Sequence, residues 1–477
     1  MTQCNANELF FQDLGSRNVV ARFDGGQVTS DAGGLLLREV EAKFHFIAQF
    51  AGCFTDHRDA DLIEHTLPEL LKQRIFGLCL GYEDLNDHDQ LRYDPLLAVL
   101  VDKKDPQGQK RLRARDRGKA LAGKSTLNRL ELTPVRANAS SRYKKIVAHL
   151  DRMQAFLVEA FLQQYLLPPA RLILDLDATD NPLHGHQLGR FFHGYYDEYC
   201  YLPLYIFCGD HPLLALLRPS NIDTSTGALK HLIRIIARIR QAWPDVQIVL
   251  RGDSGFCREP LMRWCEANGV AYLFGLAKNQ RLRRLLGGAM HQAQEQFTQT
   301  KEAARVFKDF TYRTHKSWSR ERRVVGKAEY LAKGENPRFV VTSLAADAYP
   351  AARLYEQEYC GRGDMENRIK EQQLFLFAYR TSCATMRANQ VRLLLSAVAY
   401  VVVRALRQFG LAQTELASAQ ADTMRLKLFK IGAVIRFSVR RVWVALSEGY
   451  PFRDVFVQVW ENLRRLVVPP PAVISTG

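Results

Sequence analysis

The stretch RLILDLD (171–177) has the pattern of a β-strand that ends in two carboxylates. Because side chains alternate along a strand, its three leucines face one side, and Asp175 and Asp177 face the other. Two carboxylates on one face of a buried strand either meet cations or reach water at the edge of the sheet. A single acid in such a place is more often structural, so the other acids of the chain decide between these readings.

Strands and helices follow this stretch in an order typical of an α/β protein. The expected strands cover 202–207, 213–218, 246–253, 270–277 and 338–344, and the expected helices cover 226–243, 260–269 and 351–378. Between them, residues 279–337 are polar, basic and partly alternating, which predicts a small β-rich insertion. We therefore expect an α/β core that is interrupted by an insertion.

A second acid occupies an equivalent position at the end of a later strand. Asp253 closes the strand VQIVLRGD (246–253), and the Ser-Gly pair after it turns the chain. Taken alone, this acid fits equally well as the N-cap of the helix that begins near residue 258. Its position nevertheless mirrors that of the acids at the end of 171–177.

The third candidate acid lies on the expected long helix over 351–378. At about 100° per residue, Tyr359, Arg362, Glu366 and Gln373 fall within about 60° of one another on a helical wheel, while the neighbouring acids point elsewhere. The alternative for Arg362 and Glu366 is an ordinary i,i+4 ion pair on an exposed face. An arginine, a glutamate and a tyrosine on one core-facing stripe favour a functional site.

Three carboxylates from two strand ends and a helix can hold two divalent metal ions. Such a pair activates a water or hydroxyl and stabilises the leaving oxygen in phosphodiester displacement. Mg²⁺ suits this task because it binds through few carboxylates and retains waters, and we expect Mn²⁺ to substitute for it. Asp177, Asp253 and Glu366 are therefore the expected metal ligands and catalytic residues.

The order of these acids resembles that of an RNase H-like DDE transposase, and Tyr359-x2-Arg362-x3-Glu366 is similar to the Y-x2-R-x3-E signature of cut-and-paste bacterial insertion-sequence transposases. Further stretches resemble the insertion-sequence thirteen-eighty family specifically. They are FTDHRDADLIEH (54–65), LGYEDLNDHDQLR (80–92), STLNRLE (125–131), DLDATDNPLHGH (175–186), GYYDEYCYLPLYIF (194–207), LRGDSGFCRE (250–259) and YCGRGDMENRIKE (359–371). The likeness covers nearly the whole chain.

This resemblance implies an RNase H-like mixed-sheet core, with a β-rich insertion between the second Asp and the Glu. The family pattern of Asp, small residue and Thr assigns the first catalytic acid to Asp177, with Asp175 as the alternative. The resemblance also implies that Tyr359 and Arg362 contact DNA phosphates or a flipped base near the cut.

The chain departs from the wider signature at one position. A lysine is expected seven positions after the glutamate, and Gln373 stands there. Lys370, one turn after Glu366, is the candidate to take over its contact with DNA. The role of the glutamine is left open by the sequence.

The most basic part of the chain is residues 103–145, where fourteen Lys and Arg residues face three acidic ones. The whole chain has a formal net charge of +16 and a pI near 9.5, which suggests a polyanionic partner. A solvated charged face is the alternative, but this concentration favours a surface that contacts DNA phosphates. The residues expected to contact DNA there are Arg113, Arg115, Arg117, Lys124 and Arg129.

Residues 118–125, GKALAGKS, match the Walker A pattern G-x-x-x-x-G-K-[ST] of ATP- and GTP-binding proteins. That pattern functions between a buried strand and a helix, and the preceding QKRLRARDR is not a buried strand. We expect a basic loop and a helix start, with Ser125 or Thr126 as the helix cap. No ATP is therefore expected as a cofactor.

Other motifs weigh less. His184 and His186 could be metal ligands, but a loop role is expected because no cysteine or further histidine lies nearby. The aromatic loop FFHGYYDEY (191–199) could stack on bases or pack over the sheet. The apolar run 393–403 is too short to span a bilayer and predicts a buried helix.

The length of 477 residues and a hydrophobic content of 47% allow more than one domain. We expect an N-terminal, mainly helical DNA-binding region (1–165), a catalytic core in two parts (166–278 and 338–410), the insertion (279–337) and a basic C-terminal module (411–477). The nine cysteines form no C-x-x-C pair, and MTQCNANELFF (1–11) shows no signal peptide, so the bacterial cytoplasm, close to the nucleoid, is the expected compartment.

The sequence thus predicts a DDE transposase that binds the terminal inverted repeats of an insertion sequence, cleaves both ends and joins them to target DNA. Synapsis of two ends implies a homodimer, and no membrane is expected as a partner. The alternatives are a metal-dependent nuclease of the same fold without strand transfer, and a catalytically inactive DNA-binding relative. The presence of all three acids counts against the second alternative.

Overall fold

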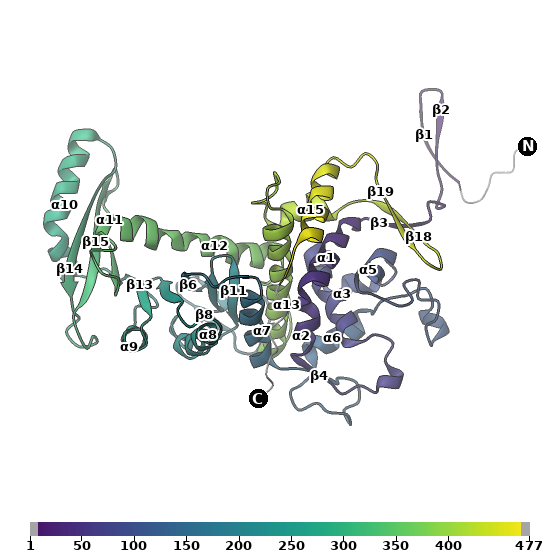
Figure 1. The fold of residues 1–477 in the computed structure, drawn as a ribbon, viewed down its shortest axis with the longest axis horizontal. Helices are drawn as coiled ribbons and strands as arrows, with labels where there is room; N and C mark the ends of the chain where they lie inside the picture. The colour runs from purple at the N-terminus through teal and green to yellow at the C-terminus, as the bar shows by residue number, and fades with distance from the viewer. Residues whose placement is uncertain (1–7, 469–477) are drawn as a thin grey trace, which may run out of the picture. The chain divides into compact units, whose positions relative to one another are not determined.

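The computed structural model describes residues 8–468. The expected absence of a signal peptide (1–11) and the end of the expected C-terminal module therefore fall partly outside the described residues. Contacts divide the chain into two compact units (Figure 1). Within the described residues, the helical unit comprises 8–147 and 402–467, and the sheet unit comprises 148–401 together with Val468. The boundaries expected from the sequence stay predictions.

The sheet unit contains a nine-stranded mixed sheet with the order β11-β10-β6-β12-β13-β17-β15-β14, and β16 pairs with β15. β6, the third strand in this order, runs parallel to β12 and antiparallel to β10. The strands are β6 (Arg171–Ala178), β10 (Leu204–Cys208), β11 (His211–Leu216), β12 (Gln247–Gly252), β13 (Ala271–Leu276), β14 (Ala304–Tyr312), β15 (Arg322–Leu331), β16 (Gly334–Glu335) and β17 (Arg338–Thr342). The expected α/β class with a large mixed sheet is confirmed.

Helices and a small sheet complete this unit. They are α7 (Leu150–Leu162), α8 (Ala228–Ala242), α9 (Glu259–Ala267), α10 (Gln280–Thr300), α11 (Ala351–Arg353), α12 (Gly363–Lys370) and α13 (Met386–Ala405), with β7 (Asn181–Pro182), β8 (Phe191–His193) and β9 (Glu198–Tyr201). Leu172, Leu174 and Leu176 of β6 belong to one core cluster with apolar side chains of α8, α9 and α10. The alternation predicted for 171–177 is therefore confirmed, and it leaves the acids on the other face.

The segment 279–337 differs from the expected β-rich insertion. Its first part is the helix α10, which begins after Asn279, whose side chain accepts a hydrogen bond from the Leu282 amide at 3.0 Å. The strands β14 and β15 that follow extend the main sheet beyond β17. The helix was missed because Gly287-Gly288 and many polar residues obscure an apolar stripe that includes Leu282 and Leu286.

The long helix expected over 351–378 is present over 351–375, but it is irregular. A π-helical stretch (Leu354–Tyr359) and a 3₁₀ turn (Cys360–Arg362) precede α12, and a second π-helical stretch (Glu371–Phe375) follows it. The helix Met386–Gly410, which contains the apolar run 393–403, is long and apolar enough to cross a membrane. However, 89% of its apolar window is buried inside the protein, as expected of a core helix.

The helical unit is built from short helices and small sheets. They are α1 (Leu35–Phe44), α2 (Phe46–Ala51), α3 (Leu67–Leu80), α4 (His88–Leu91), α5 (Pro95–Leu100), α6 (Lys124–Leu132), α14 (Ala421–Met424) and α15 (Arg453–Arg465), with β1 (Leu9–Leu14), β2 (Arg17–Ala21), β3 (Gln27–Thr29), β4 (Phe54–Asp56), β5 (Ile146–Ala148), β18 (Ala433–Phe437) and β19 (Val442–Leu446). β3 pairs with β18, so chain segments from both ends of the sequence form one sheet.

Local signals explain where two of these helices begin and end. α3 starts at a capping box of Thr66 and Glu69 and ends at Gly81, which adopts a left-handed φ of 99°. α6 begins at Lys124, and its N-cap is Gly123 without a side-chain cap hydrogen bond. The expectation that Ser125 or Thr126 caps this helix is therefore wrong, because both residues already lie within its first turn.

Candidate active site

Two of the three predicted acids lie at the same edge of the main sheet. Asp177 is the second-to-last residue of β6, and Asp253 directly follows β12. These two strands are parallel neighbours, and Gly252 pairs with Leu176 in their register. Parallel neighbours end at the same edge, which brings the two carboxylates together. The Asp253 carboxylate accepts a hydrogen bond from the Gly255 amide at 2.8 Å, so it closes its own turn instead of capping α9.

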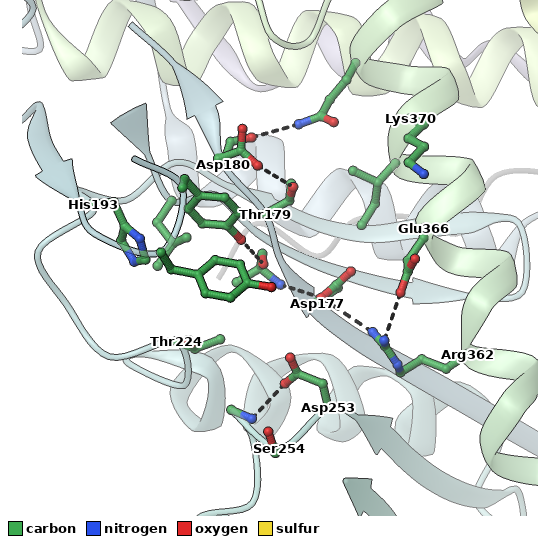
Figure 2. Close-up of a pocket in the computed structure, with 17 residues that line it drawn as sticks. Asp177, Thr179, Asp180, His193, Thr224, Asp253, Ser254, Arg362, Glu366 and Lys370 are labelled. Carbon is green, nitrogen blue, oxygen red and sulfur yellow. Dashed lines mark hydrogen bonds and ion pairs between the residues drawn. The ribbon is translucent and has the colours of Figure 1, made fainter. Parts of the chain in front are cut away.

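The third acid approaches this edge from the irregular helix (Figure 2). Glu366 of α12 accepts a hydrogen bond from Arg362 Nη2 at 2.8 Å, and Arg362 Nη1 lies 3.7 Å from Asp177 Oδ1. A cavity of about 750 Å³ is lined by all three acids and by Arg362. The structure therefore brings Asp177, Asp253 and Glu366 to one cavity, and a guanidinium stands between two of them.

Burial and crowding of like charges perturb the first acid. Burial raises the pKa of Asp177 to about 7; Arg362 lowers this pKa, while Asp253 and Glu366 raise it further. One guanidinium therefore does not balance the three carboxylates. A site that contains more buried negative charge than positive charge is suited to a bound cation.

Asp175, the alternative first acid, is engaged elsewhere. Its carboxylate accepts hydrogen bonds from Arg251 Nε at 2.5 Å and Nη2 at 2.8 Å, and it does not line the cavity. Arg251 Nη1 also donates to the backbone carbonyl of Glu358. A Cβ at Gly361 would lie 2.8 Å from the same guanidinium, so a glycine permits this close approach. The Asp175–Arg251 pair thus ties the sheet to the helix just before Arg362.

The signature residues around the acids divide into two groups. Tyr359 lines an adjoining cavity of about 510 Å³ together with Asp253 and Arg362, and burial raises its pKa. Lys370 lines the acid cavity itself (Figure 2). Gln373 also borders the cavity, but its amide donates to the Asp180 carbonyl at 3.1 Å, a structural contact that holds the helix against the end of β6.

Several lining residues were not predicted individually. Tyr195 and Tyr196 of the aromatic loop 191–199 line the acid cavity, as do Thr179 and Thr224. The run of aromatic residues was the signal for the tyrosines, and Tyr195 is 85% exposed, which leaves its ring accessible. His186 instead contacts Arg190 at 3.2 Å, outside this cavity.

The donor chemistry of the acid cavity fits a divalent cation, although its present geometry does not form a ligand set. Among residues 8–468, no three His, Cys, Asp or Glu side chains are close enough to hold a metal ion. Hard carboxylate oxygens are nevertheless the ligands that Mg²⁺ and Mn²⁺ prefer. The Arg362 guanidinium supplies the positive charge between Asp177 and Glu366 in this arrangement.

The basic residues predicted to contact DNA belong to the helical unit and are not all together. Arg113, Arg115 and Arg129 line a second cavity, of about 690 Å³. Arg117 is exposed and does not line it. Lys124 is held by the Asn86 side chain at 3.0 Å and by the Asp89 carboxylate at 3.4 Å. Three of the five predicted side chains therefore share a site.

Of the two elements that flank a nucleotide-binding loop, a strand before it and a helix after it, GKALAGKS has only the helix. The helix α6 follows it, but residues 102–123 contain turns and a 3₁₀ turn (Ala114–Asp116) and no strand. The Lys124 amine, which would reach the terminal phosphates in such a loop, instead contacts Asn86 and Asp89. The Asp89 carboxylate also accepts a hydrogen bond from the backbone N–H of Lys124 at 3.1 Å, so an acid occupies the position where a nucleotide-binding loop would hold a phosphate.

The chain was compared with family models, with curated proteins and with solved structures. The family model described as Transposase DDE domain group 1 matches residues 11–468. No curated protein matches the sequence. One similar solved structure is described as a cryo-EM structure of a piggyBac transposase synaptic complex with hairpin DNA. It is 11% identical with a TM-score of 0.40, over 84% of this chain and 80% of that chain.

Proposed function

This chain belongs to the Transposase DDE domain group 1 family, and from that premise we propose that it catalyses cut-and-paste transposition of an insertion sequence of the thirteen-eighty type. The observation that carries the proposal is the convergence of Asp177, Asp253 and Glu366 on one cavity, with Arg362 between two of them. The parallel pair β6 and β12 supports an RNase H-like arrangement of this core.

Transposases of this family typically use divalent metal ions. Asp177, Asp253 and Glu366 would hold two Mg²⁺ ions, for which Mn²⁺ would substitute. When bound, such ions activate a water or hydroxyl and stabilise the leaving oxygen of a phosphodiester. The residues of the chain contribute the surplus negative charge that draws the ions in, since Arg362 offsets only part of it.

Cations beside the acids would position the DNA strand. Arg362 and Lys370 line the acid cavity, and Tyr359 lines the adjoining one, so all three are placed to contact phosphates or an unstacked base near the cut. The reaction hydrolyses the phosphodiester at each element end and frees a 3′-hydroxyl. That hydroxyl then attacks a phosphodiester of target DNA and displaces the 3′ oxygen of the target strand, so the number of phosphodiester bonds is conserved in the joining step.

The element ends would bind through the basic residues of the helical unit. Arg113, Arg115, Arg117, Lys124 and Arg129 are the proposed contacts with the terminal inverted repeats. Two ends must be held together before joining, which favours a homodimer in the active complex. The proposed DNA-binding region (1–165) and the C-terminal module (411–477) would serve these contacts, and neither ATP nor a membrane takes part.

A cleavage assay tests the proposal. The substrate is a supercoiled plasmid that carries the ends of the element, with Mg²⁺, and the proteins are wild type, Glu366→Gln and the control Asp364→Asn. Asp364 lies on the same helix, is exposed and does not line the cavity. We expect cuts at the ends with wild type and control only; equal cutting by Glu366→Gln would exclude Glu366 as a ligand. Cleavage without joined products would favour the nuclease alternative.

A further inference from the structure

The second cavity of the chain, within the helical unit, is strongly basic. Of the residues that line its about 690 Å³, nine are Arg or Lys and three are Asp or Glu. They come from three separate stretches, 58–65, 111–129 and 142–145, together with Arg92. Such a concentration of cations in a concave site raises the local concentration of anions.

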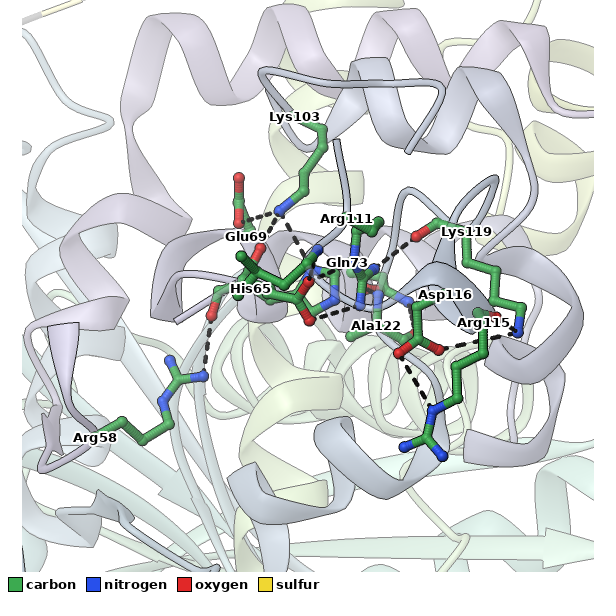
Figure 3. Close-up of polar contacts among 12 residues, drawn as sticks. Arg58, His65, Glu69, Gln73, Lys103, Arg111, Arg115, Asp116, Lys119 and Ala122 are labelled. Carbon is green, nitrogen blue, oxygen red and sulfur yellow. Dashed lines mark hydrogen bonds and ion pairs between the residues drawn. The ribbon is translucent and has the colours of Figure 1, made fainter. Parts of the chain in front are cut away.

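Ion pairs inside the cavity neutralise part of this charge and hold its walls (Figure 3). Arg111 forms a two-point contact with Glu64, with both N···O distances 3.0 Å. Arg115 and Lys119 each lie 3.9 Å from Asp116. The Arg111–Glu64 pair connects the loop around 111–119 with the segment that precedes α3, and the contacts with Asp116 lie within the loop, so the cavity has a defined shape.

Within residues 8–468, four guanidiniums of the cavity form no ion pair with a carboxylate. They belong to Arg92, Arg113, Arg129 and Arg142. Arg129 is half-buried on α6, and burial together with the nearby Arg58 lowers its pKa. Arg58 is itself fixed by Asp56 at 2.6 Å, so it cannot turn away from Arg129. Arg142 stacks on the ring of Tyr143, 4.8 Å from its centroid.

Arg58 is paired with Asp56, but Arg129 lines the same cavity without a carboxylate partner, so its positive charge favours an anion in that space. A phosphate suits that position because a guanidinium donates two parallel hydrogen bonds to its oxygens. The aromatic ring of Tyr143, which also lines the cavity, is 60% exposed and offers a surface for a sugar of the DNA backbone.

We propose that this cavity binds backbone phosphates of double-stranded DNA, with Arg58, Arg129 and Arg142 as its main contacts. The proposal rests on the proposed function, since it assumes that DNA is the partner. It adds Arg58 and Arg142 to the contacts expected from the sequence, whereas Lys124 does not line this cavity. Recognition here is of the phosphate backbone and is independent of base sequence.

The stretch GKALAGKS (118–125) borders this cavity, so the phosphate bound there could belong either to a nucleotide or to the DNA backbone. Lys119, Gly123 and Ser125 line it, whereas Lys124 is held by Asn86 and Asp89. A nucleoside triphosphate would require that lysine at its terminal phosphates. DNA phosphates can bind through the guanidiniums alone, so duplex DNA is the favoured ligand. Binding of a free nucleotide in the cavity would contradict this proposal.

Binding of a fluorescein-labelled, random-sequence DNA duplex to the full chain, followed by anisotropy in EDTA at several KCl concentrations, tests the proposal. For Arg129→Gln with Arg142→Gln, we expect Kd to rise about tenfold for each lost guanidinium. The slope of log K against log salt should fall by about 0.9 for each lost phosphate contact. The control is Arg284→Gln with Lys333→Gln, which removes the same charge from two exposed positions of the sheet unit.

A structural role for Arg129 gives a different result. Since its removal relieves repulsion with Arg58, Arg129→Gln should melt no lower than wild type while it binds DNA more weakly, and Arg129→Lys should retain most of the salt slope. Equal Kd for the cavity variant and wild type, or an equal loss in the control, would overturn the proposal. The proposal would also be overturned if ATP or pyrophosphate displaced the duplex at a concentration below that of the DNA phosphates in the assay.

The same assay separates this proposal from the proposed function. Binding in EDTA requires none of the three acids, so Asp253→Asn should bind the duplex like wild type. Intact binding without plasmid cleavage would count against the proposed function alone. Intact cleavage with no effect of the cavity variant would count against the phosphate cavity alone.

Discussion

The acid cavity of the sheet unit and the basic cavity of the helical unit are similar in size and opposite in charge. Their volumes are about 750 and about 690 Å³. The acid cavity takes its charge from two strand ends and one helix, and two of its three acids, Asp177 and Glu366, form ion pairs with Arg362. The basic cavity takes its charge mostly from loops, and pairs such as Arg111–Glu64 hold those loops in place. Parallel strand ends bring Asp177 and Asp253 to one edge of the sheet, whereas the loops of the basic cavity are connected by ion pairs.

Removal of an acid should have the largest effect. For Asp253→Asn we expect the rate of cleavage of a plasmid with the element ends to fall about a thousandfold. This corresponds to a loss of about 4 kcal/mol of transition-state stabilisation. Binding to the ends should persist, because the basic cavity does not depend on this residue. Gel-shift and cleavage assays on one preparation check both. Loss of binding would instead mark Asp253 as a structural acid.

Disruption of the Arg251–Asp175 pair should have the second-largest effect. Arg251→Gln leaves Asp175 buried without its partner, so we expect about 3 kcal/mol less stability in urea unfolding. Cleavage should fall as well, since the guanidinium ties the helix before Arg362 to β12. The double variant Arg251→Gln with Asp175→Asn should regain stability but not cleavage. Full activity in the double variant would contradict a positioning role.

The acid cavity should also respond to pH in protein kept metal-free with EDTA. The pKa of Asp177 is about 7 in the folded chain against 3.8 for the ordinary group, so between these values the folded state binds a proton that the unfolded state lacks. Stability should therefore increase as the pH falls from 7 towards 5, by about 1 kcal/mol per pH unit at most, relative to Asp177→Asn. Parallel pH profiles of the two melting temperatures would contradict this.

The basic cavity can be compared with the surface beside it. Reversal of Arg113, Arg115 and Arg117 to Glu together should weaken DNA binding and reduce the salt slope by up to about three. Single reversals sharpen the comparison, because Arg113 and Arg115 line the cavity and Arg117 does not. We expect the two lining residues to lower the affinity more. Equal effects at all three positions would favour a diffuse charged face.

The smallest effect is expected at Lys124. Its amine contacts Asn86 and Asp89, so Lys124→Ala removes an exposed contact worth about 0.5 kcal/mol in thermal melting. Cleavage should show no ATP requirement before or after the substitution. An ATP-dependent activity that Lys124→Ala abolishes would restore the nucleotide-binding interpretation of GKALAGKS.

Regular elements made most of the sheet unit predictable. The alternation of 171–177, the helical stripe that includes Arg362 and Glu366, and the buried run 393–403 are local patterns, and the structure confirms the elements they indicate. The helix α10 escaped prediction because two glycines and many polar residues conceal its stripe. The irregular turns before and after α12 have no sequence signal, since π-helical and 3₁₀ stretches use the same residues as an α-helix.

The sequence by itself identified the candidate residues for the proposed chemistry: three acids at strand ends and on a helix, and a concentration of cations over 103–145. Only the tertiary structure decided which of two adjacent acids lines the cavity, because Asp175 and Asp177 share a strand face and differ only in what packs above them. It also decided that Arg58 and Arg142 join Arg129, since loops separated along the chain meet through long-range contacts that no local period encodes.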